Sequence, residues 1–396
     1  MQALLTICVW PTFFLFAFPV FAHVDSCPLF SYQCFTGCCP VEEPHLISSE
    51  YVVSGRIILA KDNHIFTSYV IPMNSTKSWK SEAASYSPAT KTWTYDRQDF
   101  GNRANFLQYN RKTGRLHRGA SKQHRRSVNY MYSDNQGLTW ESFGKTPALG
   151  EAKADPITEC LMAVDSKDRP QFLCTERKLN TLMTWAGTDW QRITYDLKTD
   201  IHKSHINASM FLRSGYLDRP YLLDVDDISH DRKHNNTLNL HFFTGNQWVT
   251  DKIKPFNEYG FNPNETPSFI FDVHGDIHAF SLVSTKDQRG ILYAFKSIRN
   301  NTWSTQLIRT WKKVRSDRSL NLQVKRELIN GKYLMVVLSS QGEGAYHYGT
   351  KGDWKSIDLE EYPQDFAIHK DEEMIYYLHS MRSSSGLYLS RSPLDL

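Results

Sequence analysis

The chain repeats one hydrophobic pattern: a short apolar run, a polar turn, and a second run in which apolar and polar residues alternate. The pattern occurs in the stretches QYNRKTGRLHRG, AVDSKDRPQFLC, FLRSGYLDRPYLL, IFDVHGDIHAFS and AIHKDEEMIYYL. Alternation with a period of two is typical of β-strands, and two strands joined by a polar turn predict a hairpin. A third strand follows, as in LNLHFF and ILYAFKS, and long amphipathic helical patterns are nearly absent. The pattern predicts an all-β protein.

Tryptophans follow these units at roughly regular intervals. Six of them are separated by 47 to 58 residues: Trp93, Trp140, Trp190, Trp248, Trp303 and Trp354. Four strands in a unit of this length describe a blade of a β-propeller. After Trp354 one more hairpin and third strand follow, and the chain then ends without a fourth strand. We expect residues 49–60 to supply that strand, because closing the ring with both termini removes open sheet edges. This favours seven blades, with six as the alternative.

The N-terminus has the features of a secretion signal. Residues 1–22 are apolar and end in Val20-Phe21-Ala22, the small-residue form of a signal-peptidase site. Pro11 and Pro19 interrupt the run and no basic cluster follows it, which argues against the alternative, a membrane anchor. We therefore expect a signal peptide at 1–22, a cysteine-rich segment at 23–47 and the propeller at 48–396. The mature protein is expected to be secreted and extracellular, with no membrane span.

The cysteines agree with export. Six remain after the signal: Cys27, Cys34, Cys38, Cys39, Cys160 and Cys174. An even number in an oxidising compartment indicates disulfides. Cys160 and Cys174 flank a predicted hairpin, so we expect them to pair, and the other four to form a small knot. A metal site is the alternative for the knot, but the adjacent Cys38 and Cys39 and the missing CxxC spacing argue against zinc. No metal and no cofactor is predicted.

Five Asn-x-Ser/Thr sequons occur, at Asn74, Asn207, Asn235, Asn264 and Asn300. Those that carry a glycan mark exposed loops of a secreted glycoprotein.

The stretch SDNQGLTW resembles the Asp-box, or BNR repeat, of the sialidase superfamily, Ser-x-Asp-x-Gly-x-Thr-Trp. Ser133, Gly137, Thr139 and Trp140 match, and Asn135 replaces the Asp. The resemblance implies a tight turn between the third and fourth strands of a blade, in which polar side chains satisfy turn amides and the glycine takes a positive φ. The tryptophan ring is expected to be buried between blades, with a partner for its N–H.

In that family the box is structural, so it implies a fold rather than a reaction. Sialidase chemistry needs three arginines around the sugar carboxylate, a Tyr–Glu nucleophile pair and an Asp acid. Arg56 stands where the family's first arginine lies, but the Pro of its Arg-Ile-Pro motif is absent. We expect Arg56 to be an ordinary strand residue and the chain to be a divergent member without the full catalytic set. No catalytic residue is assigned.

Basic residues gather in the predicted loops between second and third strands and between blades, which usually carry the ligands of propellers. The expected ligand-binding residues are Lys122, His124, Arg125, Arg126, Arg177, Arg232, Arg289 and Arg315. A basic rim attracts anions, and arginine matches carboxylate or sulfate in a bidentate manner. The alternative is that these charges only keep the surface soluble. Secretion argues against nucleic acid, so the expected partner is an anionic carbohydrate (sialylated, uronate or sulfated) or a glycoprotein.

His117 and His278 occupy matching places in GRLH and GDIH. Because the position repeats, we expect a structural packing role; a pair of general bases or metal ligands is the alternative.

Three functions stay open. The first is a secreted propeller that binds an anionic glycan through its basic loops. The second is a carbohydrate-active enzyme, either a sialidase-like glycosidase or a polysaccharide lyase. A resemblance to propeller lyases in blade rhythm implies His124, Arg125, Tyr259 and Arg315 as candidates around a uronate. The third is a protein-binding scaffold that docks through the knot at 27–39. The sequence contains no nucleophile elbow, P-loop, dinucleotide fingerprint or HExxH motif.

Overall fold

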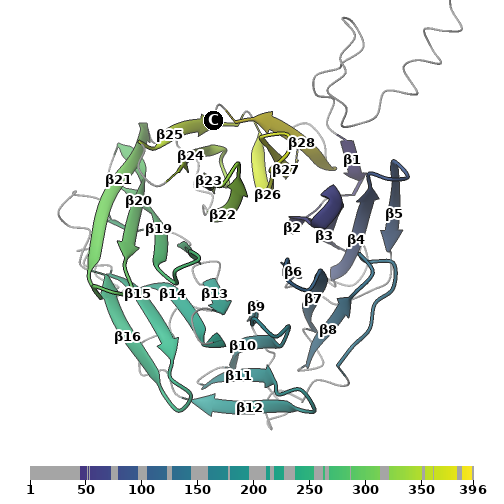
Figure 1. Ribbon diagram of the computed structural model, residues 1–396, viewed down its shortest axis with the longest axis horizontal. Coiled ribbons are helices and arrows are strands. Elements are labelled where there is room, and N and C mark those ends of the chain that lie inside the picture. The colour runs from purple at the N-terminus through teal and green to yellow at the C-terminus, as the bar shows by residue number, and fades with distance from the viewer. Residues whose placement is uncertain are drawn as a thin grey trace, which may run out of the picture.

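The repeated hairpins form seven antiparallel sheets arranged around a central axis (Figure 1). The all-β, seven-bladed propeller predicted from the sequence is confirmed. The computed structural model describes residues 45–50, 52, 54–72, 79–96, 105–122, 127–143, 159–176, 179–195, 211–214, 218–226, 237–253, 262–263, 267–285, 287–312, 321–349, 353–359, 361–380 and 386–394. The expected signal peptide and the cysteine knot lie outside these residues.

Each blade begins with its strand nearest the axis and ends at the rim (Figure 1). Blade 1 contains β2 (Ser54–Leu59), β3 (Ile65–Pro72), β4 (Trp79–Ser87) and β5 (Thr92–Asp96), with the 3-10 turn η1 (Lys61–Asn63) between its first two strands. Blade 2 contains β6 (Asn105–Asn110), β7 (Arg115–Lys122) and β8 (Ser127–Ser133); an isolated bridge between Tyr132 and Glu141 marks its rim. Blade 3 contains β9 (Glu159–Val164), β10 (Pro170–Glu176), β11 (Leu179–Trp185) and β12 (Trp190–Tyr195).

Blade 4 contains β13 (Phe211–Ser214), β14 (Pro220–Asp226), β15 (Thr237–Phe243) and β16 (Trp248–Ile253). In blade 5, β17 (Asn262–Pro263) and β18 (Ser268–Phe271) both pair with β19 (Ile277–Ser284), and β20 (Gln288–Lys296) and β21 (Trp303–Lys312) follow. Blade 6 contains β22 (Leu322–Ile329), β23 (Lys332–Ser339), β24 (Glu343–Tyr348) and β25 (Lys355–Asp358). Blade 7 contains β26 (Tyr362–His369), β27 (Met374–Ser380) and β28 (Leu387–Pro393), and it is completed by β1 (His45–Ser48).

The antiparallel order gives the ring two distinct faces. The hairpin face carries the turns between the first and second strands of each blade, together with the turns before the rim strands. The connection face carries the turns between second and third strands and the links from one blade to the next.

The ring closes with a different segment from the one expected. Residues 49–60 do not supply the missing strand, since β2 within them is the innermost strand of blade 1. The closing strand is the one before it, β1, in which His45 pairs with Leu389 and Leu46 with Tyr388. β2 is the more apolar of the two strands, and it lies at the axis, where Ile57 is fully buried. The rim position of β1 is more exposed, and Leu46 there is 44% exposed. The ring therefore extends to His45, three residues beyond the expected boundary.

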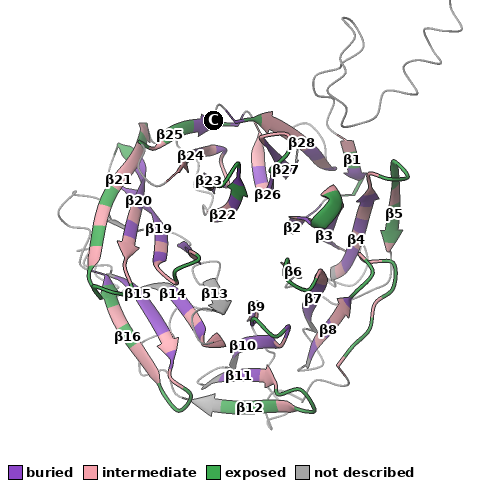
Figure 2. Cartoon of the chain, viewed as in Figure 1, coloured by how far each residue is buried: buried purple, intermediate pink, exposed green. Residues whose placement is uncertain are grey.

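The hydrophobic core lies between neighbouring blades rather than in one central cluster. Ile57 and Tyr69 of blade 1 pack with Tyr376 and Leu378 of blade 7. Comparable clusters join blades 4 and 5, blades 5 and 6, and blades 6 and 7. Buried residues accordingly follow the inner and middle strands, and exposed residues follow the rim (Figure 2).

The repeated tryptophans stand at or just before the rim strands. Trp190 donates its indole N–H to the carbonyl of Phe143 in the preceding blade at 3.2 Å. Trp303 donates in the same way to the carboxylate of Asp251 at 3.1 Å. These two rings thus tie blades 3 and 5 to the blades before them, and because a tryptophan stands at this place in each of six blades, the period of the tryptophans matches that of the blades.

The turn at residues 133–140 has the hydrogen bonds expected of its polar side chains. Ser133 Oγ accepts from the Gly137 N–H at 2.8 Å, and Asn135 Oδ1 accepts from the Thr139 N–H at 2.9 Å. Gly137 has a φ of +83°. Trp140 packs in a cluster shared by blades 1 and 2. Asn135 accepts with the same side-chain oxygen that an aspartate would use, so the exchange leaves the turn intact.

Substituting Gly137 by alanine should destabilise the protein for two reasons. A Cβ at this positive φ would lie 2.5 Å from the ring of Phe66. We expect Gly137→Ala to lower the free energy of unfolding by about 2–4 kcal/mol in urea titrations. Gly245, in the matching turn of blade 4, has a φ of +106°, and a Cβ added there would meet no atom within 4 Å. Gly245→Ala should cost only about 1 kcal/mol; equal losses in the two variants would contradict the contact with Phe66.

The predicted disulfide is confirmed. Cys160 and Cys174 are bonded and face one another across the pair β9–β10. Of the five sequons, Asn300 lies exposed in the turn between β20 and β21, and the other four lie outside the described residues. In the part of the chain that the structure describes, there is no helix whose length and apolar character would let it cross a membrane.

Candidate functional site

Most of the loop cations expected to bind a ligand lie outside the described residues: His124, Arg125, Arg126, Arg177, Arg232 and Arg315, together with Tyr259. Lys122 is the last residue of β7. Arg289, at the connection face of blade 5, is 5% exposed, and its Nη1 donates to Gln341 Oε1 of blade 6 at 3.2 Å. This arginine therefore joins two blades.

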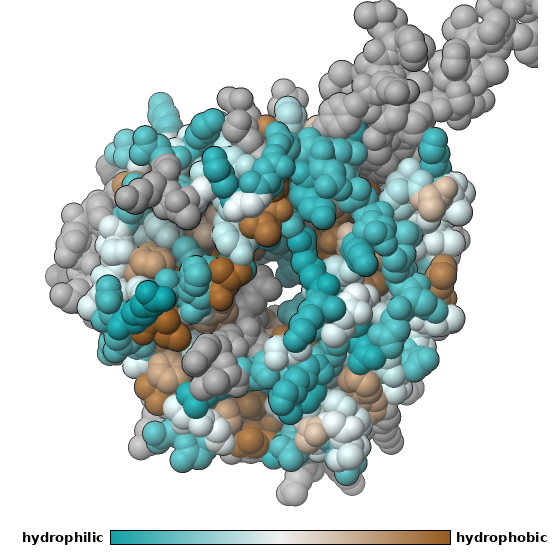
Figure 3. Space-filling view, viewed as in Figure 1, coloured by the Kyte–Doolittle hydropathy of each residue, from teal (hydrophilic) through white to brown (hydrophobic). Residues whose placement is uncertain are grey.

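The structure has a cavity of about 370 Å³ on the axis. Its walls come from the inner strands of five blades, β2, β6, β18, β22 and β26, and from the turn after β6. The lining residues fall mainly in the second half of each strand, so the cavity lies toward the hairpin face. Its volume is in the range of small-ligand pockets. Hydrophilic side chains border the opening at the centre of the ring (Figure 3).

Charged side chains are concentrated in this cavity. Arg111, Lys325, Arg326 and Glu327 line it, beside Gln108 and Tyr109. The remaining wall is apolar and includes Ile58, Ile270 and Phe271. Glu327 is paired with Arg111, and Asp365 behind the wall is paired with Lys325, so Arg326 is the cation in excess, and its charge favours an anion.

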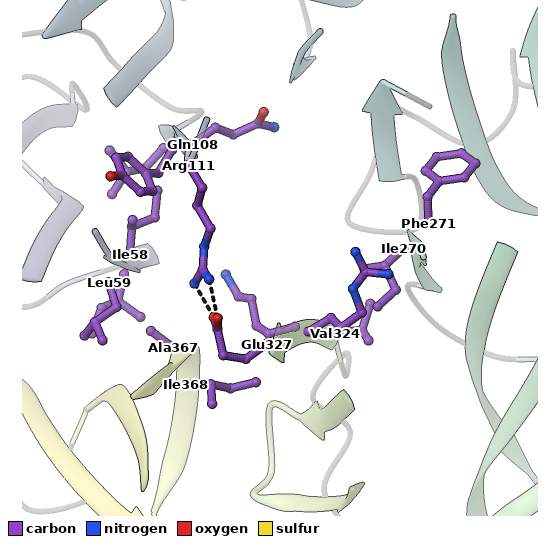
Figure 4. Close-up of a pocket in the computed structure, with 15 residues that line it drawn as sticks. Ile58, Leu59, Gln108, Arg111, Ile270, Phe271, Val324, Glu327, Ala367 and Ile368 are labelled. Atoms are coloured by element: carbon purple, nitrogen blue, oxygen red, sulfur yellow. Dashed lines mark hydrogen bonds and ion pairs between the residues drawn. The ribbon is translucent and has the colours of Figure 1, made fainter. Parts of the chain in front are cut away.

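One ion pair crosses the axis. Arg111, in the turn after β6 of blade 2, donates both terminal nitrogens to the carboxylate of Glu327 on β22 of blade 6 (Figure 4). The side chain of Glu327 is 3% exposed, whereas that of Arg111 is 58% exposed. Removing the arginine would strand a buried carboxylate, which is strongly unfavourable. The pair therefore fixes the distance between two blades on opposite sides of the ring.

A second set of polar groups joins blades 1, 6 and 7 at the axis. Asp365 is 2% exposed, and it accepts from Lys325 Nζ at 3.2 Å and from the Ile57 N–H at 3.1 Å. With its amide turned to satisfy both neighbours, Gln323 donates to Asp365 at 3.0 Å and accepts from Arg56 at 2.6 Å. Arg56, expected to be an ordinary strand residue, thus belongs to a network at the axis.

Arg326 differs from the other two cations of the cavity because no carboxylate of the described residues is bonded to it. Its guanidinium lies over the ring of Tyr333, 4.7 Å from the centroid. Its Nη1 is buried and has no hydrogen-bond acceptor among the described residues. Burial lowers the pKa of Arg326, and the nearby Arg111 adds to this effect. Among the described lining residues, Arg326 is thus the cation best placed to meet a ligand.

The two matching histidines lie at the hairpin face, each bonded to a tyrosine. His117 Nδ1 is 2.8 Å from Tyr130 Oη, and its Nε2 is 3.1 Å from Asp168 Oδ1. His278 Nδ1 is 2.9 Å from Tyr293 Oη. The repeated packing position expected from the sequence is present at both sites, and no group of metal-binding side chains occurs among the residues that the structure describes.

Sequence reasoning missed the axial cations. The signal that could have revealed them is the strand LQVKRELI, where three charged residues stand in a row on the first strand of a hairpin. The first strand of each blade lies at the axis, where charge is costly to bury without a partner. Consecutive charges there indicate partners across the ring.

No protein-family model matches the sequence, and no curated protein matches it. Among solved structures, the chain resembles the polysaccharide lyase Uly1, with a TM-score of 0.52 and 9% identity over 86% of this chain and 90% of that one. It is also similar to an α-L-arabinanase of Penicillium chrysogenum complexed with arabinobiose, with a TM-score of 0.48 and 13% identity over 89% and 99% of the two chains. A GH93 α-L-arabinofuranosidase of Fusarium graminearum matches with a TM-score of 0.48 and 11% identity, over 89% of this chain and 97% of that one. The likeness to the lyase shows a shared propeller fold.

Two histidines, the buried His379 and the largely buried His278, should make stability depend on pH. Burial lowers the pKa of His278 and that of His379 to about 4, from 6.5. The unfolded chain therefore binds more protons than the folded one between these values, and the free energy of unfolding should fall as the pH drops from about 6.5 to 4. Urea unfolding across this range should show a shallower decline for His379→Gln and an unchanged one for His274→Gln, which alters an exposed imidazole. If the free energy of unfolding declines equally with falling pH in the wild type and both variants, the lowered pKa of His379 is refuted as a cause.

Proposed function

We propose that the protein is a secreted carbohydrate-active enzyme that cleaves an acidic polysaccharide, with β-elimination as the reaction. The observation that carries the proposal is the axial cavity, in which cations from different blades outnumber the carboxylate. The shared fold with a polysaccharide lyase supports the reaction type. The Asp-box-like turn at 133–140 is compatible with a sialidase-like origin of the scaffold.

The chemistry gives the cations a role. In β-elimination, a base removes the proton next to the carboxylate of a uronate and a carbon–carbon double bond forms, while the leaving oxygen departs with its bonding electrons and takes up a proton to become a hydroxyl. Negative charge develops on the carboxylate during proton removal, so a fixed cation beside it stabilises the transition state. A guanidinium is suited to this because its planar donors match a carboxylate. Arg111 and Lys325 are already bonded to Glu327 and Asp365. Arg326 Nη1, in contrast, has no acceptor among the described residues, so Arg326 is the lining cation available to a substrate carboxylate.

Binding of an anionic glycan without cleavage is the second candidate. The cationic excess of the cavity favours it equally, and so do the basic residues expected in the connection-face loops. Hydrolysis is the third outcome that one assay can separate from the other two.

The deciding experiment uses the mature protein and a panel of sialylated glycans, uronate polymers and sulfated glycans. A lyase produces new reducing ends together with the ultraviolet absorbance of an unsaturated uronate. A hydrolase produces reducing ends alone, and a binding protein produces neither but is retained on the immobilised polymer. If no polymer of the panel is cleaved and none retains the protein, a carbohydrate ligand is refuted.

Arg326→Gln should lower kcat/KM on the cleaved polymer by about tenfold or more, because a cation facing the substrate carboxylate is lost. The variant strands no protein carboxylate, so the fold should persist, as circular dichroism can check. Arg299→Gln, on the exposed turn before β21, removes the same charge far from the cavity and should leave kcat/KM unchanged. Equal activity of the two variants would rule out Arg326 as a substrate contact.

The connection-face loops are tested separately. Replacing Arg125 and Arg126 by glutamate should abolish retention on the anionic polymer at low salt, because charge contacts at a surface are screened by ions and reversed by the substitution. Retention that survives the double substitution would dismiss the basic-rim hypothesis while leaving the axial cavity in place.

A further inference from the structure

The guanidinium of Arg326 is held by an aromatic ring where comparable arginines are also held by a carboxylate. Among the described residues, three arginines lie over an aromatic ring: Arg115 over Tyr132, Arg309 over Trp311 and Arg326 over Tyr333. Asp134 is bonded to the first of them and Asp358 to the second. No carboxylate of the described residues is bonded to Arg326, so the ring of Tyr333 is its main partner.

The alternation of two neighbouring strands brings Arg326 and Tyr333 to the same face of blade 6. Val324 of β22 and Met335 of β23 belong to the apolar cluster between blades 5 and 6. Arg326 and Tyr333 each lie two residues from these positions, on the side of the hairpin face. Because every second side chain of a strand points to the same face, both of them face blade 5. Arg326 pairs with Met335 in the ladder, so Tyr333 is its diagonal neighbour, within reach of a long side chain.

The ring of Tyr333 stands on a firmly held part of the blade. Its strand β23 is paired with β22 on one side and with β24 on the other. The carbonyl of Tyr333 also accepts from the N–H of Gly349 at 2.8 Å. Arg326 carries its charge at the end of a long side chain with several rotatable bonds. The ring on the central strand therefore restricts where that charge can lie.

An aromatic ring holds a cation without neutralising it. The face of the ring carries only a partial negative charge, whereas a carboxylate carries a full one. In the same cavity, Glu327 neutralises Arg111 and Asp365 neutralises Lys325. Arg326 lines the cavity beside these pairs, and its positive charge stays available to an anion.

We propose that Tyr333 is a positioning residue, whose ring fixes the guanidinium of Arg326 at the wall of the axial cavity and leaves its charge for the carboxylate of a uronate. Tyr333 is not among the described residues that line the cavity, so it acts through Arg326 rather than by touching the substrate. A cation that is fixed before the substrate arrives needs no reorganisation to stabilise the developing charge. The choice of a uronate rests on the proposed function.

The first test replaces the ring in the full mature chain. Tyr333→Leu removes the ring face, and it should lower kcat/KM on the cleaved polymer about fivefold, mainly through kcat, because the guanidinium is no longer fixed for the transition state. Tyr333→Phe keeps the ring face and should retain most of the activity. Circular dichroism checks that both variants are folded.

A double-mutant cycle separates positioning from a general effect on the fold. In the Arg326→Gln background, Tyr333→Leu should have no further effect on kcat/KM, because the cation that the ring positions is gone. Tyr348→Leu is the matched control: Lys332 Nζ lies 5.4 Å from the ring centroid of Tyr348 in the same sheet, and neither residue is among the described lining of the cavity. This variant should leave kcat/KM unchanged.

A binding measurement makes the test independent of cleavage. The affinity of the same proteins for free glucuronate, with glucose as the neutral control, is measured by ligand-observed NMR. We expect Tyr333→Leu to weaken glucuronate binding about fivefold in the wild-type background and not in the Arg326→Gln background. Glucose binding should be the same in all variants.

Two results would overturn the inference while the enzyme stands: wild-type activity and affinity in Tyr333→Leu, or an equal loss in both backgrounds. If the wild type cleaves no polymer, the proposed reaction fails and glucuronate affinity alone decides; a loss confined to the wild-type background upholds the positioning role. If the wild type neither cleaves a polymer nor binds glucuronate, Arg326 meets no carboxylate, and the positioning role is refuted together with the proposed function.

Discussion

Closure of the ring is the constraint on which the rest of the structure depends. Every blade covers its two apolar faces with its neighbours alone, so the first and last blades must also meet. They are joined at the rim by β1, which pairs with β28, and at the axis by Asp365, which accepts from the backbone of Ile57. The apolar cluster between these two contacts contains side chains of both blades. The axial cavity exists only because this closure holds five inner strands around it.

Much of the fold was predictable because its strongest signals are local and repeated. A polar turn between alternating strands is visible within a dozen residues, and the tryptophans recur at the blade period because each stands at or just before the rim strand of its blade. The closing strand was placed wrongly for the opposite reason. It has only four residues, His45–Ser48, and its sequence carries little alternation, whereas the adjacent β2 is a longer and more apolar run.

The cavity could not be predicted in the same way, since its residues come from strands far apart in the chain. Arg111 and Glu327 are separated by 216 positions, yet they form a bidentate pair across the axis. Individual charges on inner strands are visible in the sequence, but their pairing depends on how the blades are rotated around the ring. The same pairing decides which cation can meet a ligand. Arg111 and Lys325 are bonded to carboxylates, whereas Arg326 lies over the ring of Tyr333. The basic loops of the connection face stay a prediction.

The hydrogen bond between Asp365 and Ile57 spans 308 positions of the chain. During synthesis, blade 1 emerges first and must wait with an uncovered apolar side until almost the whole polypeptide has left the ribosome. Contacts between such distant segments slow folding, and partly made sheets are prone to aggregate. The outer strand of the last blade is thus among the first segments of the ring to be made, and it finds its partner only at the end.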